Sequence, residues 1–127
     1  WGSYEGDADA DGKRQGKGKM IYESGNYYEG GFLDDKFHGK NSVYHWTDGD
    51  EYLGEWKEGE RHGKGSFRNA DGSVEYSMYE NGQAKGDGVM LTSDRKTAHS
   101  SVDGEKKLEM RIVDAESLIK EKYDFLA

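Results

Sequence analysis

The stretch from Tyr52 to Gly72 reads YLGEWKEGERHGKGSFRNADG, and it is the most regular copy of a unit that recurs along the chain. In its first half Tyr, Gly and Trp occupy alternate positions up to Trp56, and in its second half Gly, Gly and Phe do so up to Phe67. Alternation with a period of two predicts two β-strands. The segment KEGER between them predicts a hairpin turn in which Gly59 supplies a positive φ.

The unit recurs every 23 or 24 residues, and glycines mark the period. The glycine rows leave only Gly31 of the 19 glycines outside. Two of these rows are Gly16, Gly39, Gly63, Gly86 and Gly18, Asn41, Gly65, Gly88, and an aromatic row is Tyr4, Tyr28, Tyr52. A lone hairpin is marginal in water, so we expect successive hairpins to lie side by side in one antiparallel sheet. The glycines would then let rings lie flat over the backbone of a neighbouring strand.

The pattern Tyr52-x-Gly-x-Trp-x-x-Gly-x-x-His-Gly-x-Gly resembles the MORN repeat position for position, and the segment from Tyr28 to Asn41 resembles it nearly as well. The resemblance covers about residues 1–95. It implies a curved, single-layer β-sheet with a groove lined by aromatic rows, and it implies an adaptor that is not an enzyme. Some members of the family, such as junctophilins and plant phosphatidylinositol phosphate kinases, join membranes or lipids.

We therefore expect a mainly β fold, a single-layer antiparallel sheet of repeated hairpins with a short C-terminal α-helix. The expected division is a repeat array over residues 1–95, a degenerate terminal hairpin over 96–113 and a helix within 114–127. Asp114 is a good N-cap for a helix from about 115 to 125. One face of that helix would carry Ala115, Leu118, Ile119, Lys122 and Leu126. The helix would either cap the array or dock onto another subunit.

Several units depart from the pattern. Asp7, Asp9 and Asp11 match the opening of a calcium-binding loop, but Gly18 stands where the closing carboxylate belongs. This tip is therefore either a solvated acidic turn or a weak cation site, and we expect no metal or other cofactor. One extra residue in the second unit, near Trp46, suggests a bulge or a longer turn.

The fourth unit is the most degenerate. Glu75 replaces the tyrosine of the aromatic row, Ser77 replaces a glycine, and Arg95 replaces the glycine of the turn between units.

Composition narrows the class of partner. Hydrophobic residues make up only 32% of the chain and the net charge is −8, which disfavours nucleic acid as a partner. No apolar run approaches the length of a transmembrane helix. The absence of cysteine suits a reducing compartment, so we expect an intracellular protein, soluble or peripheral to a membrane, in a compartment that the sequence does not specify.

Nothing in the sequence resembles catalytic machinery or a small-molecule site. His38 and His62 occupy the histidine position of the repeat, where a structural hydrogen bond near the hairpin turn is the simplest role. His45 and His99 are isolated, and no metalloprotease, serine-elbow or phosphate-loop motif is present. We therefore expect a protein that is not an enzyme.

The first candidate binding surface is an aromatic groove. Its expected residues are Tyr28, Phe32, Tyr52, Trp56, Phe67 and Tyr79. Large exposed apolar patches mark partner sites, and rings are preferred anchors. The simplest function is thus a scaffold or accessory subunit that binds another protein there. The competing structural explanation is that the C-terminal helix folds back over these rings.

The second candidate surface is basic. Lys17, Lys40 and Lys64 are expected to form a ladder on the face opposite the rings, among glutamates of the first strands. Such a ladder is either ordinary cross-strand pairing or a contact site for anionic phospholipid headgroups, which is the alternative function.

Overall fold

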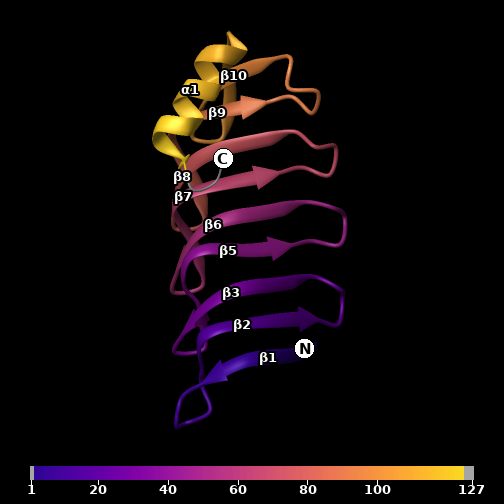
Figure 1. Cartoon of the computed structure of the whole chain (residues 1–127), viewed down its shortest axis with the longest axis vertical. Coiled ribbons are helices and arrows are strands. Elements are labelled where there is room, and N and C mark those ends of the chain that lie inside the picture. The colour runs from indigo at the N-terminus through magenta and orange to yellow at the C-terminus, as the bar shows by residue number, and fades with distance from the viewer. Residues whose placement is uncertain (1, 125–127) are drawn as a thin grey trace.

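The computed structural model describes residues 2–124, and within them eleven β-strands form one antiparallel sheet. Apart from the short β4, which pairs with β3, the strands lie beside their neighbours in sequence. The hairpins stack from β1 at one end to β10 near the other, where α1 lies beside the last strands (Figure 1). The expected fold class is confirmed. The elements are β1 (Gly2–Ala8), β2 (Arg14–Tyr22), β3 (Tyr27–Leu33), β4 (Lys36–Phe37), β5 (Gly39–His45), β6 (Glu51–Lys57), β7 (Glu60–Arg68), β8 (Val74–Glu80), β9 (Gln83–Leu91), β10 (Ala98–Val102), β11 (Glu105–Met110) and α1 (Ile112–Lys122).

Two-residue turns close four of the hairpins. They are Asp34-Asp35, Glu58-Gly59, Asn81-Gly82 and Asp103-Gly104. Both residues of each turn have a positive φ, which is the type I′ geometry whose twist matches that of the flanking strands. The φ of Gly59 is 84°, so the turn predicted there is confirmed.

A bulge follows the turn of each regular hairpin. In the third unit, two residue steps from Gly54 to Trp56 face four steps from Gly65 to Arg61. Gly63 lies inside this bulge with a φ of 68°. Gly16 and Gly86, at the equivalent positions, have φ values of 73° and 74°. The left-handed backbone of the bulge therefore explains why this position repeats as glycine.

The second unit carries its extra residue elsewhere than predicted. Between β5 and β6 the register shifts between Gly39 and Ser42, and Asn41 there has a φ of 55°. The extra residue thus lies before Ser42, and the predicted position near Trp46 is wrong. As a result Ser42, rather than Asn41, pairs with Gly54 in the glycine row.

Tyr4 and Tyr52 lie over glycines, as predicted. A Cβ added to Gly65 would come within 2.5 Å of Cε2 of Tyr52, and one added to Gly18 would come within 2.5 Å of the Tyr4 hydroxyl. The hydroxyl groups of Tyr4, Tyr28 and Tyr52 each donate a hydrogen bond to the carbonyl three residues later, at 2.6, 2.7 and 3.0 Å. The glycine row is therefore the surface on which the rings of Tyr4 and Tyr52 rest, whereas Ser42 stands in this row in the unit of Tyr28.

The helix α1 packs on the face opposite the rings. Its buried residues Ala115 and Ile119 join Val89, Leu91 and Ala98 in one apolar cluster. Val89 and Leu91 alternate along β9 with Met90, so they lie on the opposite face of the sheet from Met90. Met90 pairs with Glu75, which in turn pairs with Phe67 on the ring face. The helix therefore does not fold back over the aromatic rows, and that competing explanation is wrong.

The helix also begins earlier than predicted. It starts at Ile112, and Arg111 occupies the N-cap position without a side-chain cap. Asp114 lies in the first turn, where its carboxylate accepts hydrogen bonds from the Arg111 guanidinium at 3.0 and 3.2 Å. The prediction of Asp114 as N-cap is wrong because Ile112 and Ala115 extend the apolar face into this turn. Leu126, predicted on the same face, lies outside the described residues.

We predict that Gly65→Ala destabilises the fold by about 1–3 kcal/mol, because the new methyl group overlaps the Tyr52 ring. Urea unfolding followed by circular dichroism measures the change. In a Tyr52→Leu background the same substitution should cost much less, since the ring is gone. Equal costs in the two backgrounds would show that the ring does not require this glycine.

The buried rings predict an alkaline limit of stability. Burial raises the pKa of Tyr28 from 10.0 to about 12. The unfolded chain therefore loses this proton at a lower pH than the folded chain does. The contribution of Tyr28 is complete below about pH 10 and is lost as pH rises towards 12, on the order of 2 kcal/mol. Urea unfolding across this range measures the loss. An unchanged free energy of unfolding, or tyrosinate absorbance that rises fully near pH 10 in the folded protein, would contradict the prediction.

Candidate functional site

The predicted aromatic groove is mostly core. Tyr28 and Tyr52 are 0% exposed, Phe32 is 3%, Tyr79 is 6% and Trp56 is 8% exposed. Only Phe67 of the six residues is half-buried. The rings cover one another edge to face, as in the pair Tyr52–Trp56 with centroids 5.3 Å apart. The expectation that all six form an open apolar surface is therefore wrong.

One row of side chains crosses the whole ring face. Successive register partners from β1 to β7 are Tyr4, Met20, Tyr28, Tyr44, Tyr52 and Phe67. The same row then continues from β8 to β11 with Glu75, Met90, His99 and Glu109. The aromatic residues thus end at Phe67, in the middle of the sheet.

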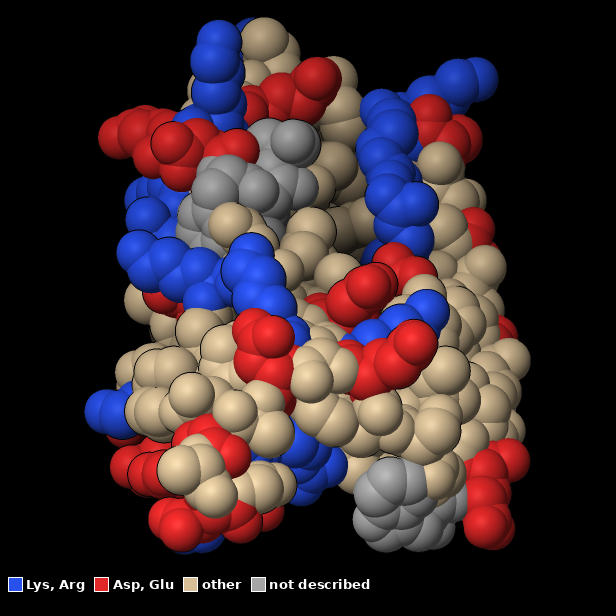
Figure 2. All heavy atoms as spheres, turned by 60° about the horizontal axis from the view of Figure 1, so that its bottom comes forward, with Lys and Arg blue, Asp and Glu red and all other residues tan. Residues whose placement is uncertain are grey.

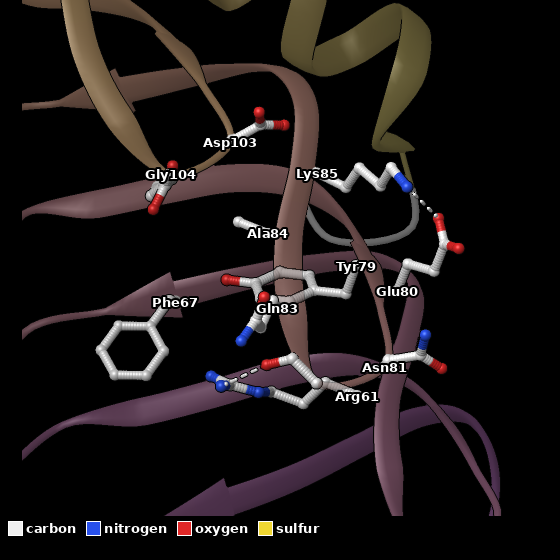
Figure 3. A pocket seen from close by; sticks show the side chains of 12 residues that line it. Arg61, Phe67, Tyr79, Glu80, Asn81, Gln83, Ala84, Lys85, Asp103 and Gly104 are labelled. Carbon is white, nitrogen blue, oxygen red and sulfur yellow. Dashed lines mark hydrogen bonds and ion pairs between the residues drawn. The ribbon is translucent and has the colours of Figure 1, made fainter.

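Two hollows open where this ring row ends. The first has a volume of about 660 Å³ and the second about 420 Å³, and both are lined by Phe67 and Glu75. The first also reaches Tyr79, Ala84 and the Asp103-Gly104 turn, as Figure 3 shows. The second reaches Met90, His99 and Lys106. We call these two adjoining hollows the ring gap.

The cause of the ring gap is local. Glu75 stands where Tyr52 stands one unit earlier, and a carboxylate side chain cannot fill the place of a ring. Its Oε2 accepts a hydrogen bond from the Ser77 hydroxyl at 3.1 Å. Ser77 is itself in a glycine position of the repeat and is only 1% exposed. The space that a tyrosine would fill above this strand is therefore left to other occupants.

The electrostatics of the ring gap centre on Glu75 and Arg61. Burial, together with the negative charge of Glu75, raises the pKa of Tyr79 to about 12, while the positive charge of Arg61 opposes this rise. The Arg61 guanidinium lies 5.2 Å from the Tyr79 ring centroid and donates to the Gly82 carbonyl at 2.6 Å. Of the other charges lining the first hollow, Lys85 pairs with Glu80 at 3.2 Å. The result is an aromatic wall beside a half-buried carboxylate, which suits binding.

The lysine ladder does not form a cationic surface. Lys17 and Lys40 are exposed and Lys64 is half-buried, and they lie on β2, β5 and β7 with other strands between them. The hollow of about 580 Å³ that includes Lys17 also includes Glu5 and Glu29. Figure 2 likewise shows basic and acidic side chains interspersed over the face that it presents.

The aspartates at the acidic tip of the first unit accept hydrogen bonds from backbone amides. The Asp7 carboxylate accepts the Lys17 amide in a bulge, at 3.3 Å, as the Glu55 carboxylate accepts that of Lys64 two units later. Asp9 accepts the amides of Asp11 and Lys13, both at 2.9 Å. Within residues 2–124 no group of three His, Cys, Asp or Glu side chains is arranged to hold a metal ion.

The repeat histidines do not have the predicted hydrogen bonds. Among the described residues the side chains of His38 and His62 make none, and His62 is exposed. The next residues, Gly39 and Gly63, instead take positive φ values of 103° and 68°. The His-Gly pairs thus mark the bulge through their glycines.

Sequence reasoning noticed the replacement at Glu75 but did not recognise it as a site. It missed Ala84 and Met90 altogether and treated His99 as isolated. The available signal was the end of the aromatic row, because the first-strand positions read Tyr4, Tyr28, Tyr52 and then Glu75. The hollow itself required the register of the strands.

Comparison with known proteins agrees with the repeated hairpins. The family model for the MORN repeat matches residues 10–27, 28–40 and 52–74. The chain is also similar to the inactive protein tyrosine kinase pTKL of Plasmodium berghei (strain Anka), with 33% identity over 76 residues. That match covers 60% of this chain and 6% of the relative, so the chain spans only a small part of that protein's length.

MORN repeats are non-catalytic and are generally modules for interaction with proteins or membranes. The part of the chain that the structure describes holds no helix long and apolar enough to cross a membrane. The three matched segments coincide with strands of the stacked hairpins, and these hairpins are MORN repeats.

Proposed function

We propose that this chain is a non-enzymatic interaction module that binds a peptide segment of a partner protein at the ring gap. The observation that carries the proposal is the end of the aromatic row at Phe67, because it opens two adjoining hollows in a face that is otherwise packed on itself. Concave sites with apolar walls and a few polar groups are typical of binding.

The lining suits a peptide. Phe67 offers a half-exposed ring and Met90 a flexible apolar side chain, which are residue types that recur at protein interfaces. Glu75 and His99 supply polar groups in the same row. Of the six rings predicted for the site, Phe67 and Tyr79 line the hollows, while Tyr28, Phe32, Tyr52 and Trp56 are buried on β3 and β6 in the aromatic cluster that Tyr79 joins.

Net charge and sequence similarity favour a protein, rather than a lipid surface, as the binding partner. A net charge of −8 opposes an anionic membrane, and the three ladder lysines lie among glutamates. The relative pTKL is named an inactive kinase, which is consistent with a role for the shared repeats other than catalysis. The absence of cysteine favours an intracellular setting for this interaction.

The test is selection from a random-peptide display library. Enriched peptides are made free and their affinities are measured by fluorescence anisotropy for the unaltered chain and for Phe67→Ala. We expect loss of at least about tenfold in affinity, since the ring is the central wall of both hollows. Leu33→Ala, which alters a side chain 50% exposed on the distant strand β3, is the matched control and should leave affinity within twofold.

Two outcomes would overturn this function. One is enrichment only of peptides that bind Phe67→Ala as well as the unaltered chain. The other is salt-sensitive binding to phosphoinositide vesicles that is lost when Lys17, Lys40 and Lys64 are changed to Glu, because that result would assign the chain to a membrane surface.

A further inference from the structure

In the first three units, one position of the repeat carries a side chain that covers rings. It lies two residues before the glycine of each bulge, and its register partners on the first strands are Ala8, Phe32, Trp56 and Tyr79. The residues at this position, which we call the covering position, are Arg14, Phe37, Arg61 and Ala84.

In the first three units, the covering side chain touches two rings, one in its own unit and one in the next. The Arg14 guanidinium lies 5.7 Å from the ring centroid of Tyr4 and 5.5 Å from that of Phe32. The Arg61 guanidinium lies 5.7 Å from the Tyr52 centroid and 5.2 Å from the Tyr79 centroid.

Phe37 follows the same rule in the second unit. Its ring stacks on Tyr28 with centroids 3.7 Å apart and meets Trp56 edge to face at 5.3 Å. The covering position therefore has a fixed relation to the tyrosine of its own unit, whichever side chain occupies it.

The fourth unit breaks this rule at both places. Ala84 is too short to cover anything, and the residue that it would cover in its own unit is Glu75 instead of a tyrosine. Both Ala84 and Glu75 line the hollow of about 660 Å³. In Figure 3 Ala84 and Arg61 lie on opposite sides of the Tyr79 ring. The fourth unit has thus lost a covering side chain and gained a carboxylate in the same place.

We propose that an arginine side chain of the partner peptide occupies this vacant covering position, with its guanidinium against the Glu75 carboxylate. The inference rests on the proposed function and names what the ring gap selects. Within residues 2–124 Glu75 forms no ion pair, so its charge is available to a cation. Two of the three intact covering side chains are arginines, which shows that this face accommodates a guanidinium over its rings.

Arginine fits better than the other candidate residues. Its planar guanidinium pairs with a carboxylate through two hydrogen bonds and also stacks on aromatic rings, and Phe67 and Tyr79 supply rings here. An aromatic residue, as at Phe37, would leave the Glu75 charge unpaired. A lysine would supply the charge without the planar contact.

The test uses a seven-residue glycine-serine peptide with one central arginine and the same peptide with citrulline, which has the shape of arginine without its charge. Two-dimensional amide NMR of the full chain follows each titration. We expect the arginine peptide to shift the resonances of Phe67, Glu75 and Ala84, and the citrulline peptide to bind at least about tenfold more weakly.

Three variants make the result specific. Glu75→Gln should lower the affinity for the arginine peptide at least about tenfold. Ala84→Arg should abolish binding of this peptide, because the chain then fills its own covering position. Glu29→Gln, which alters an exposed glutamate on the distant strand β3, should change affinity less than twofold. Thermal unfolding of each variant confirms that it is folded.

Equal shifts by the arginine and citrulline peptides, or full binding to Ala84→Arg, would overturn the arginine inference. The proposed function would survive that result if library-selected peptides still lose affinity for Phe67→Ala. If those peptides bind Phe67→Ala as tightly as the unaltered chain, the proposed function fails as well, so the two failures are distinguishable.

Discussion

The contact on which this fold depends is a tyrosine ring lying on glycine backbone. The glycine leaves room for the ring, and the hydroxyl reaches the carbonyl three residues further along the same strand. Each such tyrosine thereby buries its ring and satisfies its only polar group at once. A sheet with one layer has little other apolar material, since hydrophobic residues are 32% of the chain. Where the tyrosine is replaced, at Glu75, the packing opens.

Neighbouring units are joined by bonds between their turns, at both ends of the strands, as well as through the rings. At the hairpin tips Arg14 pairs with Asp35 at 3.0 Å, and Arg61 reaches Gly82 one unit further. At the other end of the strands, the Asp50 carboxylate accepts a hydrogen bond from the Ala70 amide at 2.8 Å. These bonds join residues about one repeat apart, so each unit is held mainly by its immediate neighbours. Local changes in one unit should therefore leave distant units packed.

Much of this architecture could be predicted because glycine reports backbone geometry directly. Positive φ at Gly59 and the crowding of a ring over Gly65 are properties of single positions, and a repeat displays them several times. Exposure could not be predicted in the same way. Whether Tyr28 lies in a groove or in a core depends on how Phe37 and Trp56 stack around it, and that follows from strand register and sheet curvature.

The C-terminal part illustrates the same limit. The apolar pattern of the helix was visible, but the face that it covers depends on which side of β9 carries Val89 and Leu91. The ring gap was hidden for a related reason, because Glu75 and Ala84 are nine residues apart in sequence and meet only when β8 pairs with β9. The short side chain of Ala84 can be recognised as a missing covering residue only when Arg14, Phe37 and Arg61 are known to cover rings in the other units.

The order of the strands has a consequence for how the chain acquires its structure. Because the sheet follows the order of the sequence, with only β4 off the path, every pairing closes a short loop and costs little chain entropy. Sheets built from distant segments fold slowly for the opposite reason. This sheet should instead grow from any one formed hairpin by adding neighbours in turn, and it should fold quickly for a protein with so little helix. Its loss of structure should begin at the outermost strands, with the rings of the central hairpins the last to separate.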